Sequence, residues 1–304
     1  MGVAVVFPGQ GSQSAGAGRA WLDHPAWSVI EEAEAATGLD LAHLVLDASD
    51  DELRPTREAQ LSVLLSSLLA WRGLEPSLDR TALVAVAGHS LGQITALIAA
   101  EVVGVADGIR LAVARAEATS AAQAARPGAM VALLGGTEDQ ALAACRAAPD
   151  QAWVANVNGA GQVVVGGAPE VLDLVAAEAE AVGVRRVRKL AVDGAFHTPL
   201  MQPAADALLD ELGSIRFAPP TIPIVTNDGV AVSDGEGWPQ RLADHLVRPV
   251  RWDAVVGELV DRGADTILEA GPGTTLTGLA GRIAPDVNAR SIAAPDQLPL
   301  GVER

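Results

Sequence analysis

A serine between two glycines is the clearest candidate for a nucleophile in this chain. The sequence there reads Gly88-His89-Ser90-Leu91-Gly92, after a β-branched run and before a stretch with helical spacing. G-x-S-x-G at a strand-to-helix turn is typical of a nucleophile elbow, a turn so tight that it exposes the serine hydroxyl and excludes side chains beside it. The N–H of Leu91, at the start of the following helix, would then face a developing oxyanion. The alternative is a chance match in a chain with 31 glycines.

A serine hydroxyl is weakly acidic, so it needs a base to become a nucleophile. His197 is the favoured base, because it lies in a Gly-containing loop where two subdomains are expected to meet and clefts commonly form. His89 precedes the serine on a predicted strand and should point to the opposite face. His245, in a helical segment, is the second candidate for the base. From spacing alone, a structural role for His197 is as compatible with the sequence as a catalytic one. The remaining histidines, in polar segments that we expect at the surface, are His24 and His43.

The elements that must position these residues alternate along the chain. β-branched runs predict buried strands at residues 3–7, 83–87, 130–134, 163–165, 222–225 and 266–268. Ala- and Leu-rich segments with helical spacing lie between most of them, for example at residues 58–71, 93–100, 107–123 and 169–182. Strands that alternate with helices indicate an α/β architecture with a largely parallel sheet.

A second, smaller unit is predicted within this architecture. Beyond Arg126-Pro127-Gly128, residues 129–191 read strand, helix, strand, helix, strand. That pattern suits a ferredoxin-like subdomain inserted into a larger one. We therefore expect a small subdomain at residues 127–193 and a large α/β subdomain formed by residues 1–126 and 194–304, with the chain returning near Asp193-Gly194.

Composition and charge exclude several classes of protein. The net charge of -17 should repel nucleic acid and anionic membranes, so both are poor partners. The longest apolar stretches, at residues 61–71 and 94–106, fall short of the ~20 residues of a membrane-spanning helix. No positive residue precedes the apolar N-terminal run, as a signal peptide would require. A single cysteine, Cys145, excludes an internal disulfide and fits a reducing compartment, so we expect a cytoplasmic protein.

Four motifs together resemble a known family, the malonyl-CoA:acyl-carrier-protein transacylases, which include fatty-acid synthesis enzymes and the acyltransferase domains of polyketide synthases. The resemblance extends from Phe7 to about Arg282 and implies a hydrolase-like α/β core with a ferredoxin-like small subdomain. The motifs occur in this order: Gly9-Gln10-Gly11-Ser12-Gln13, Gly88-His89-Ser90-Leu91-Gly92, Gly194-Ala195-Phe196-His197 and Glu269-Ala270-Gly271-Pro272-Gly273.

The resemblance implies roles for the reacting groups. Ser90 matches the residue that becomes acylated, and His197 matches the general base that later acts as acid. Gln10, in the first loop, would shape the oxyanion site together with the N–H of Leu91. No aspartate completes a triad in this family, so a backbone carbonyl near residues 249–252 is expected to orient the histidine, the task that Asp performs in hydrolases.

The resemblance also implies an acyl pocket. Arg115 matches the arginine that binds the free carboxylate of malonate, and a guanidinium can do so through two parallel hydrogen bonds. The alternatives are an arginine that reaches water or pairs with Glu117. Phe196 would crowd an α-methyl branch, a discrimination of ~1–3 kcal/mol. Thr119 stands where methionine is usual, one helical turn after Arg115, so it could face the pocket and widen it.

These matches imply transfer of a malonyl group from CoA to the phosphopantetheine thiol of an acyl carrier protein, through an acyl-enzyme on Ser90. No metal or redox cofactor is expected, and a monomer is the default. The alternatives are an editing acyl hydrolase or thioesterase, transfer of another dicarboxylic acyl group, or a non-catalytic carrier-binding scaffold. The pathway, fatty-acid or polyketide, stays open. A basic cluster could dock the carrier or CoA phosphates, or could simply be a solvated strand edge: Arg185, Arg186, Arg188 and Lys189.

Overall fold

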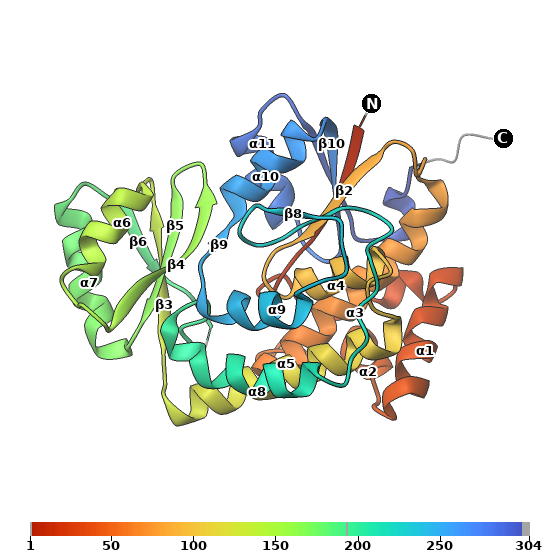
Figure 1. Ribbon diagram of the computed structural model, residues 1–304, viewed down its shortest axis with the longest axis horizontal. Helices are drawn as coiled ribbons and strands as arrows, with labels where there is room; N and C mark the ends of the chain where they lie inside the picture. The colour runs from red at the N-terminus through yellow and green to blue at the C-terminus, as the bar shows by residue number, and fades with distance from the viewer. Residues whose placement is uncertain (1, 193, 300–304) are drawn as a thin grey trace.

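The computed structural model describes residues 2–192 and 194–299 and contains two β-sheets covered by helices (Figure 1). The first sheet has the strand order β11-β10-β1-β2-β7-β8. All neighbouring strands in it are parallel except the β7–β8 pair, which confirms the predicted α/β architecture with a largely parallel sheet. Its strands are β1 (Gly2–Phe7), β2 (Leu83–Gly88), β7 (Ile224–Val225), β8 (Ala231–Val232), β10 (Ala264–Ala270) and β11 (Asn288–Ile292).

Helices cover both faces of this sheet, which explains why its strands are continuous apolar runs. In the central strand β1, Val5 and Phe7 face one side, towards the core that α1, α3, α4 and α5 complete. Ala4 and Val6 face the other side, towards α10 and α11. The helices are α1 (Ser28–Thr37), α2 (Ala42–Leu46), α3 (Thr56–Leu74), α4 (Gly92–Ala99), α5 (Val105–Ala125), α6 (Glu138–Cys145), α7 (Pro169–Ala181), α8 (Gln202–Leu212), α9 (Trp238–Val247), α10 (Trp252–Asp261) and α11 (Thr275–Ile283).

Short 3-10 helices complete the connections between these elements. They are η1 (Arg19–Trp21), η2 (Pro25–Trp27), η3 (Glu75–Ser77), η4 (Pro199–Met201) and η5 (Pro295–Gln297). Among the described residues, no helix has both the length and the apolar character needed to cross a bilayer.

The second sheet has the order β6-β3-β5-β4-β9 and lies with α6 and α7 at the left of Figure 1. Its first four strands pair antiparallel. The predicted pattern was one strand short, because β4 carries Asn156 and Asn158 at alternating positions and so does not read as an apolar run. The strands are β3 (Ala129–Leu134), β4 (Ala152–Gly159), β5 (Gln162–Gly167), β6 (Arg186–Lys189) and β9 (Val250–Arg251).

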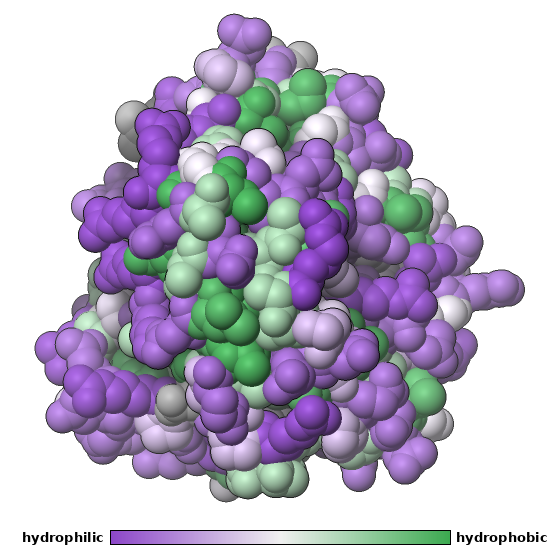
Figure 2. Space-filling view, turned by 90° about the vertical axis from the view of Figure 1, so that its left-hand side faces the viewer, coloured by the Kyte–Doolittle hydropathy of each residue, from purple (hydrophilic) through white to green (hydrophobic). Residues whose placement is uncertain are grey.

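The two faces of the second sheet have different neighbours. Val131, Leu133 and Val165 pack with α6 and α7, whereas Met130 and Val164 face the core of the first sheet. Figure 2 shows the outer side of α6 and α7, where apolar residues gather at the centre among hydrophilic ones. The exposed large apolar side chains on these two helices and at their ends are Leu142, Leu174 and Val182.

The parts of the chain that hold the two sheets also contact each other through strand pairing and hydrogen bonds. Strand β9 pairs parallel with β4, so a segment that follows the first-sheet strand β8 joins the second sheet. Arg251, on β9, donates two hydrogen bonds to the carboxylate of Glu138 on α6, at 2.6 and 2.9 Å. Asp193, where the chain was expected to return to the large subdomain, lies outside the described residues. The division at residues 127–193 therefore stays a prediction.

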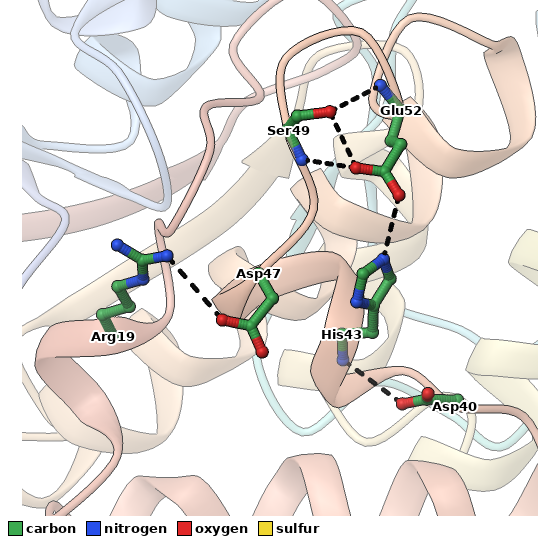
Figure 3. Close-up of polar contacts among 6 residues, drawn as sticks. All are labelled: Arg19, Asp40, His43, Asp47, Ser49 and Glu52. Atoms are coloured by element: carbon green, nitrogen blue, oxygen red, sulfur yellow. Dashed lines mark hydrogen bonds and ion pairs between the residues drawn. The ribbon is translucent and has the colours of Figure 1, made fainter.

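A network of side chains holds the loop between α2 and α3 in one shape (Figure 3). The backbone N–H and hydroxyl of Ser49 both donate to the carboxylate of Glu52, at 2.9 and 2.7 Å. The Nε2 of His43 lies 3.3 Å from the other oxygen of that carboxylate. The loop thereby places Leu53 in the core and leaves the neighbouring Arg54 exposed to solvent.

Candidate active site

A cavity of about 540 Å³ lies between the carboxyl ends of β1 and β2 and one face of the second sheet. Open parallel sheets commonly bind ligands at this edge, because the loops that follow the strands meet there. Five of the seven residues predicted for the site line the cavity: Gln10, Ser90, Arg115, Phe196 and His197. The structure therefore brings together side chains that are up to 187 positions apart, from Gln10 to His197.

Ser90 occupies the tight turn that its neighbours predict. Its φ of 53° is in the left-handed region, an uncommon and strained conformation for a residue with a side chain. A Cβ on Gly88 would lie 1.9 Å from the carbonyl carbon of Gly92, and a Cβ on Gly92 would lie 2.1 Å from the carbonyl oxygen of Phe7. The backbone N–H of Ser90 donates to the side chain of Asn227 at 3.0 Å. The turn therefore requires both glycines.

His197 is in contact with Ser90, the predicted nucleophile. Its Nε2 lies 2.7 Å from the Oγ of Ser90, and its Nδ1 lies 2.6 Å from the backbone oxygen of His245. A carbonyl oxygen can only accept, so Nδ1 carries the proton and Nε2 is free to accept the serine proton. The expected backbone acceptor is present, but its predicted position near residues 249–252 was wrong by several residues.

The reason for this position lies at the end of α9. A carbonyl group within a helix accepts a hydrogen bond from the N–H four residues later. The last carbonyl groups of a helix lack such a partner and are free to accept from elsewhere. Four residues after His245 stands Pro249, which has no N–H. The carbonyl of His245 is therefore left for His197, and the proline is the sequence signal that could have identified it.

The protonation state of His197 suits a base. Burial lowers the pKa of His197 to about 3, and the positive charge of Arg115 contributes to the shift. An imidazole with this pKa is neutral at physiological pH, so its Nε2 carries no proton and has a lone pair to accept one.

Arg115 is a buried cation next to Ser90. Its side chain, on α5, donates from Nη2 to the Oγ of Ser90 at 3.0 Å and from Nη1 to the side chain of Gln60 at 2.6 Å. No acidic side chain within the described residues forms an ion pair with it, and Glu117 instead lies 3.8 Å from Arg57. Burial lowers the pKa of Arg115 to about 10, so it stays charged at neutral pH. A buried cation without a counter-ion is costly and favours an anionic ligand.

The backbone N–H groups of Gln10, which lines the cavity, and of Leu91, which follows Ser90, are the predicted donors to an oxyanion. In the described part of the chain, neither the N–H of Gln10 nor that of Leu91 donates to a backbone or side-chain acceptor. Leu91 directly precedes α4, so its N–H belongs to the unpaired group at the positive end of that helix. Both groups suit the task of stabilising negative charge on a substrate oxygen.

The position of Thr119 corrects an expectation. Thr119 is fully buried and does not line the cavity. Its hydroxyl lies 2.8 Å from the backbone oxygen of Arg115, one turn earlier in α5, and 3.4 Å from the side-chain nitrogen of Gln60. Helical spacing placed it on the same face as Arg115, but Gln60 from α3 lies beside both residues. Thr119 therefore does not widen the pocket.

His89 lines the same cavity as Ser90, so the expectation that it faces away was wrong. The alternation of side chains in a strand fails here because Ser90 has already left the strand conformation. The ring of His89 lies 5.3 Å from that of Trp252, and its Nε2 lies 3.1 Å from the side-chain oxygen of Asn158. Burial lowers the pKa of His89, so this ring is neutral as well.

The cavity is lined by an arginine from outside the basic cluster that the sequence analysis singled out. The basic cluster Arg185, Arg186, Arg188 and Lys189 does not line the cavity, and Lys189 pairs with Asp173 at 2.8 Å. Arg54 does line it, with a side chain that is 80% exposed and 3.0 Å from Asp51. Sequence reasoning missed Arg54, because nothing in its neighbourhood distinguishes it from other surface arginines.

Fold and site together define a class, the α/β enzymes that use a serine hydroxyl on acyl groups. Comparison with known proteins gives the family, since the acyl transferase domain profile matches residues 4–284. The chain belongs to this acyltransferase family.

The names of the similar proteins specify the acyl group that those proteins transfer. The chain is 35% identical to the malonyl CoA-acyl carrier protein transacylase of Escherichia coli (strain K12), over 99% of this chain and 98% of that protein. The crystal structure of the corresponding enzyme from Xanthomonas oryzae pv. oryzae superposes with a TM-score of 0.91 at 36% identity, covering 97% and 95% of the two chains. A malonyl-transacylase in complex with its type II polyketide synthase acyl-carrier protein gives 0.90 at 34% identity, covering 97% and 96%.

Proposed function

We propose that this chain transfers a malonyl group from coenzyme A to the phosphopantetheine thiol of an acyl carrier protein, with Ser90 as the acylated residue. The observation that carries the proposal is Arg115, a buried cation that has no acidic partner among the described residues and lies 3.0 Å from the hydroxyl of Ser90. The relatives named as malonyl transacylases support the same reaction. A neutral acyl group would leave this charge buried and unpaired.

The first half-reaction forms the acyl-enzyme. His197 Nε2 accepts the proton of Ser90 as the hydroxyl oxygen attacks the thioester carbonyl of malonyl-CoA. The N–H groups of Gln10 and Leu91 stabilise the oxyanion of the tetrahedral intermediate. The carbon–sulfur bond then breaks, the CoA thiolate takes the proton from His197, and a malonyl ester remains on Ser90.

The second half-reaction reverses these steps with a different thiol. The phosphopantetheine thiol of the carrier gives its proton to His197 and attacks the ester carbonyl. The carbon–oxygen bond breaks, and Ser90 recovers its proton from the imidazolium. Kinetics of the ping-pong type follow, since CoA leaves before the carrier reacts. The chemistry needs no metal or redox cofactor.

The acyl pocket favours a short dicarboxylate. In a malonyl ester on Ser90, two carbons separate the ester oxygen from the free carboxylate, so a cation next to that oxygen can reach both. The two guanidinium nitrogens can then pair with the two carboxylate oxygens. Phe196, which lines the cavity, would contact a branch on the malonyl carbon that lies between the ester carbonyl and the free carboxylate.

The proposal includes the division into subdomains. The element order β3-α6-β4-β5-α7-β6 and the sheet order β6-β3-β5-β4 support a ferredoxin-like small subdomain at residues 127–193. The parallel first sheet with its nucleophile elbow supports a hydrolase-like large subdomain at residues 1–126 and 194–304. We expect the enzyme to act as a monomer in the cytoplasm, with the carrier protein as its partner.

Intact-mass measurement separates transfer from hydrolysis. With malonyl-CoA alone, the proposal predicts a stable malonyl adduct that is absent from Ser90→Ala and disappears when the phosphopantetheine-bearing carrier is added. An editing hydrolase would instead release free malonate without accumulating an adduct. Failure of wild-type protein to form any adduct would overturn the proposal.

A further inference from the structure

The loop between β1 and η1 is held by its own polar side chains. The hydroxyl of Ser12 donates to the backbone oxygen of Gly9 at 2.7 Å. The backbone N–H of Gly11 donates to the side-chain oxygen of Gln13, also at 2.7 Å. These four residues line the same cavity as Gln10, which lies between them in the sequence. The two peptide groups on either side of Gln10 are therefore each fixed by a hydrogen bond with a side chain.

The first of these peptide groups follows a glycine that the fold requires. A Cβ on Gly9 would lie 2.6 Å from the backbone oxygen of His89, so the loop can pack against the nucleophile elbow only without a side chain there. A glycine also leaves its backbone angles less restricted than any other residue does. The peptide group between Gly9 and Gln10 could then rotate and turn the N–H of Gln10 in another direction. The close approach to the elbow therefore creates a need for a further restraint.

The hydroxyl of Ser12 supplies that restraint. A trans peptide group is planar, and its C=O and N–H point in opposite directions. Because Ser12 fixes the oxygen of Gly9, it also fixes the direction of the N–H of Gln10. That N–H donates to no backbone or side-chain acceptor in the part of the chain that the structure describes. The hydrogen bond from Ser12 also polarises the peptide group, which makes the N–H a stronger donor.

We infer that Ser12 is a positioning residue for oxyanion stabilisation, because it holds the peptide group whose N–H, at Gln10, donates to the oxyanion. The inference rests on the proposed acyl transfer and deepens it. Gln13 assists by holding the next peptide group through the N–H of Gly11. Since an oxyanion forms in both half-reactions and with every acyl group, Ser12 contributes to the rate of transfer and not to the choice of donor.

The test is Ser12→Ala, which removes only the hydroxyl. One neutral hydrogen bond is lost, so we expect the rate constant for acylation of Ser90 at saturating donor to fall roughly three- to tenfold. The loss should be equal for malonyl-CoA and acetyl-CoA, and the half-saturating donor concentration should not change. Ser12→Thr keeps the hydroxyl and should retain the wild-type rate. Ser14→Ala is the matched control, because Ser14 is an exposed serine of the same loop that does not line the cavity.

Intact mass of quenched single-turnover reactions gives these rate constants, and an unchanged Tm shows that each variant is folded. A purely structural role of Ser12 would lower Tm and leave the saturating rate constant as it is, which would overturn the inference. A loss confined to malonyl-CoA would overturn it too, because it would place Ser12 in the binding of the free carboxylate. Wild-type protein that forms no adduct on Ser90 would instead overturn the proposed function itself.

Discussion

At the scale of single residues, the reactive centre depends on which groups are charged. His197 has a backbone carbonyl rather than a carboxylate behind it, and a cation nearby. A carboxylate would raise the pKa of the imidazole, whereas here burial and Arg115 lower it to about 3. The free enzyme therefore holds its base neutral, and ready to accept a proton, over the physiological range.

The pH profile of acylation follows from this charge state. We expect kcat/KM for acylation of Ser90 to stay constant from pH 8 down to about pH 5, without the inflection near pH 6.5 of an ordinary histidine. The pH dependence is measured from the rate at which acetyl-CoA, a donor without an ionising acyl group, labels Ser90 in reactions quenched at set times. In Arg115→Met, the loss of the guanidinium should move the inflection upwards. An inflection near pH 6.5 in the wild type would contradict the assigned environment.

Sequence reasoning was most successful for residues that sit in short, ordered motifs. Ser90 was predicted from its neighbours, and Gln10 and His197 were predicted with the help of the family resemblance; all three line the cavity. Gln60 was not found, because a glutamine in an amphipathic helix carries no signal until α3 and α5 are packed together. The orientations of Thr119 and His89 were wrong for a related reason: spacing within one element does not reveal what a second element or a change of backbone conformation brings beside it.

At the scale of elements, strands and helices with long apolar runs were predictable. Strands β1, β2 and β10 and helices α3 and α5 agree with the predicted runs to within a few residues at each end. Strand β4 was missed, because its asparagines face the cavity instead of a core. The elements that contribute polar groups to the site are thus the ones that hydrophobic patterning describes least well.

The loop between α2 and α3 yields a prediction about donor binding. The network of Ser49, Glu52 and His43 holds this loop (Figure 3). Arg54, two residues after Glu52, lines the cavity. Its exposed pair with Asp51 is weak, so a phosphate can compete for the guanidinium. In Arg54→Ala we expect KM for malonyl-CoA to rise roughly three- to tenfold, as for a rim charge.

A truncated donor serves as the control for Arg54. The malonyl thioester of N-acetylcysteamine has no phosphates, so Arg54→Ala should use it as well as the wild type does. Arg57→Ala, a nearby arginine that does not line the cavity, should leave KM for both donors unchanged. An equal loss with both donors would show that Arg54 does not contact phosphate.

At the scale of the whole molecule, one buried and two half-buried histidines link stability to pH. Burial lowers the pKa of His89, lowers that of His197 to about 3 and lowers that of His245 to about 4. Below about pH 6.5 the unfolded chain binds protons that the folded chain does not. Each histidine then reduces the unfolding free energy by up to ~1.4 kcal/mol per pH unit as the pH falls towards its folded pKa.

Urea denaturation between pH 7 and pH 5 tests this linkage. The midpoint should fall with pH, and it should fall less steeply in His245→Gln, which removes one of the three groups and keeps the backbone carbonyl. Parallel curves for the two proteins would contradict a lowered pKa of His245 in the folded protein.

The charge distribution of the whole molecule bears on the carrier protein. The net charge of -17 repels an acidic partner, and the cluster Arg185–Lys189 on and beside β6 is a local exception. If the cluster docks the carrier, charge reversal of Arg185 and Arg186 to glutamate should raise KM for the carrier at low salt. High salt should reduce the difference. Arg290→Glu, on the edge strand β11 of the other sheet, is the matched control, and an unchanged KM would remove the docking role.

The most direct test of the whole account is Ser90 labelling by malonyl-CoA and acetyl-CoA, in wild type and Arg115→Ala, followed by intact mass. The wild type should prefer malonyl-CoA, and Arg115→Ala should lose that preference by on the order of 100-fold while still accepting acetyl-CoA. Arg110→Ala, on the exposed side of α5, should behave like the wild type. Equal labelling by both donors in wild type and Arg115→Ala would contradict the assignment of Arg115 as the carboxylate-binding residue.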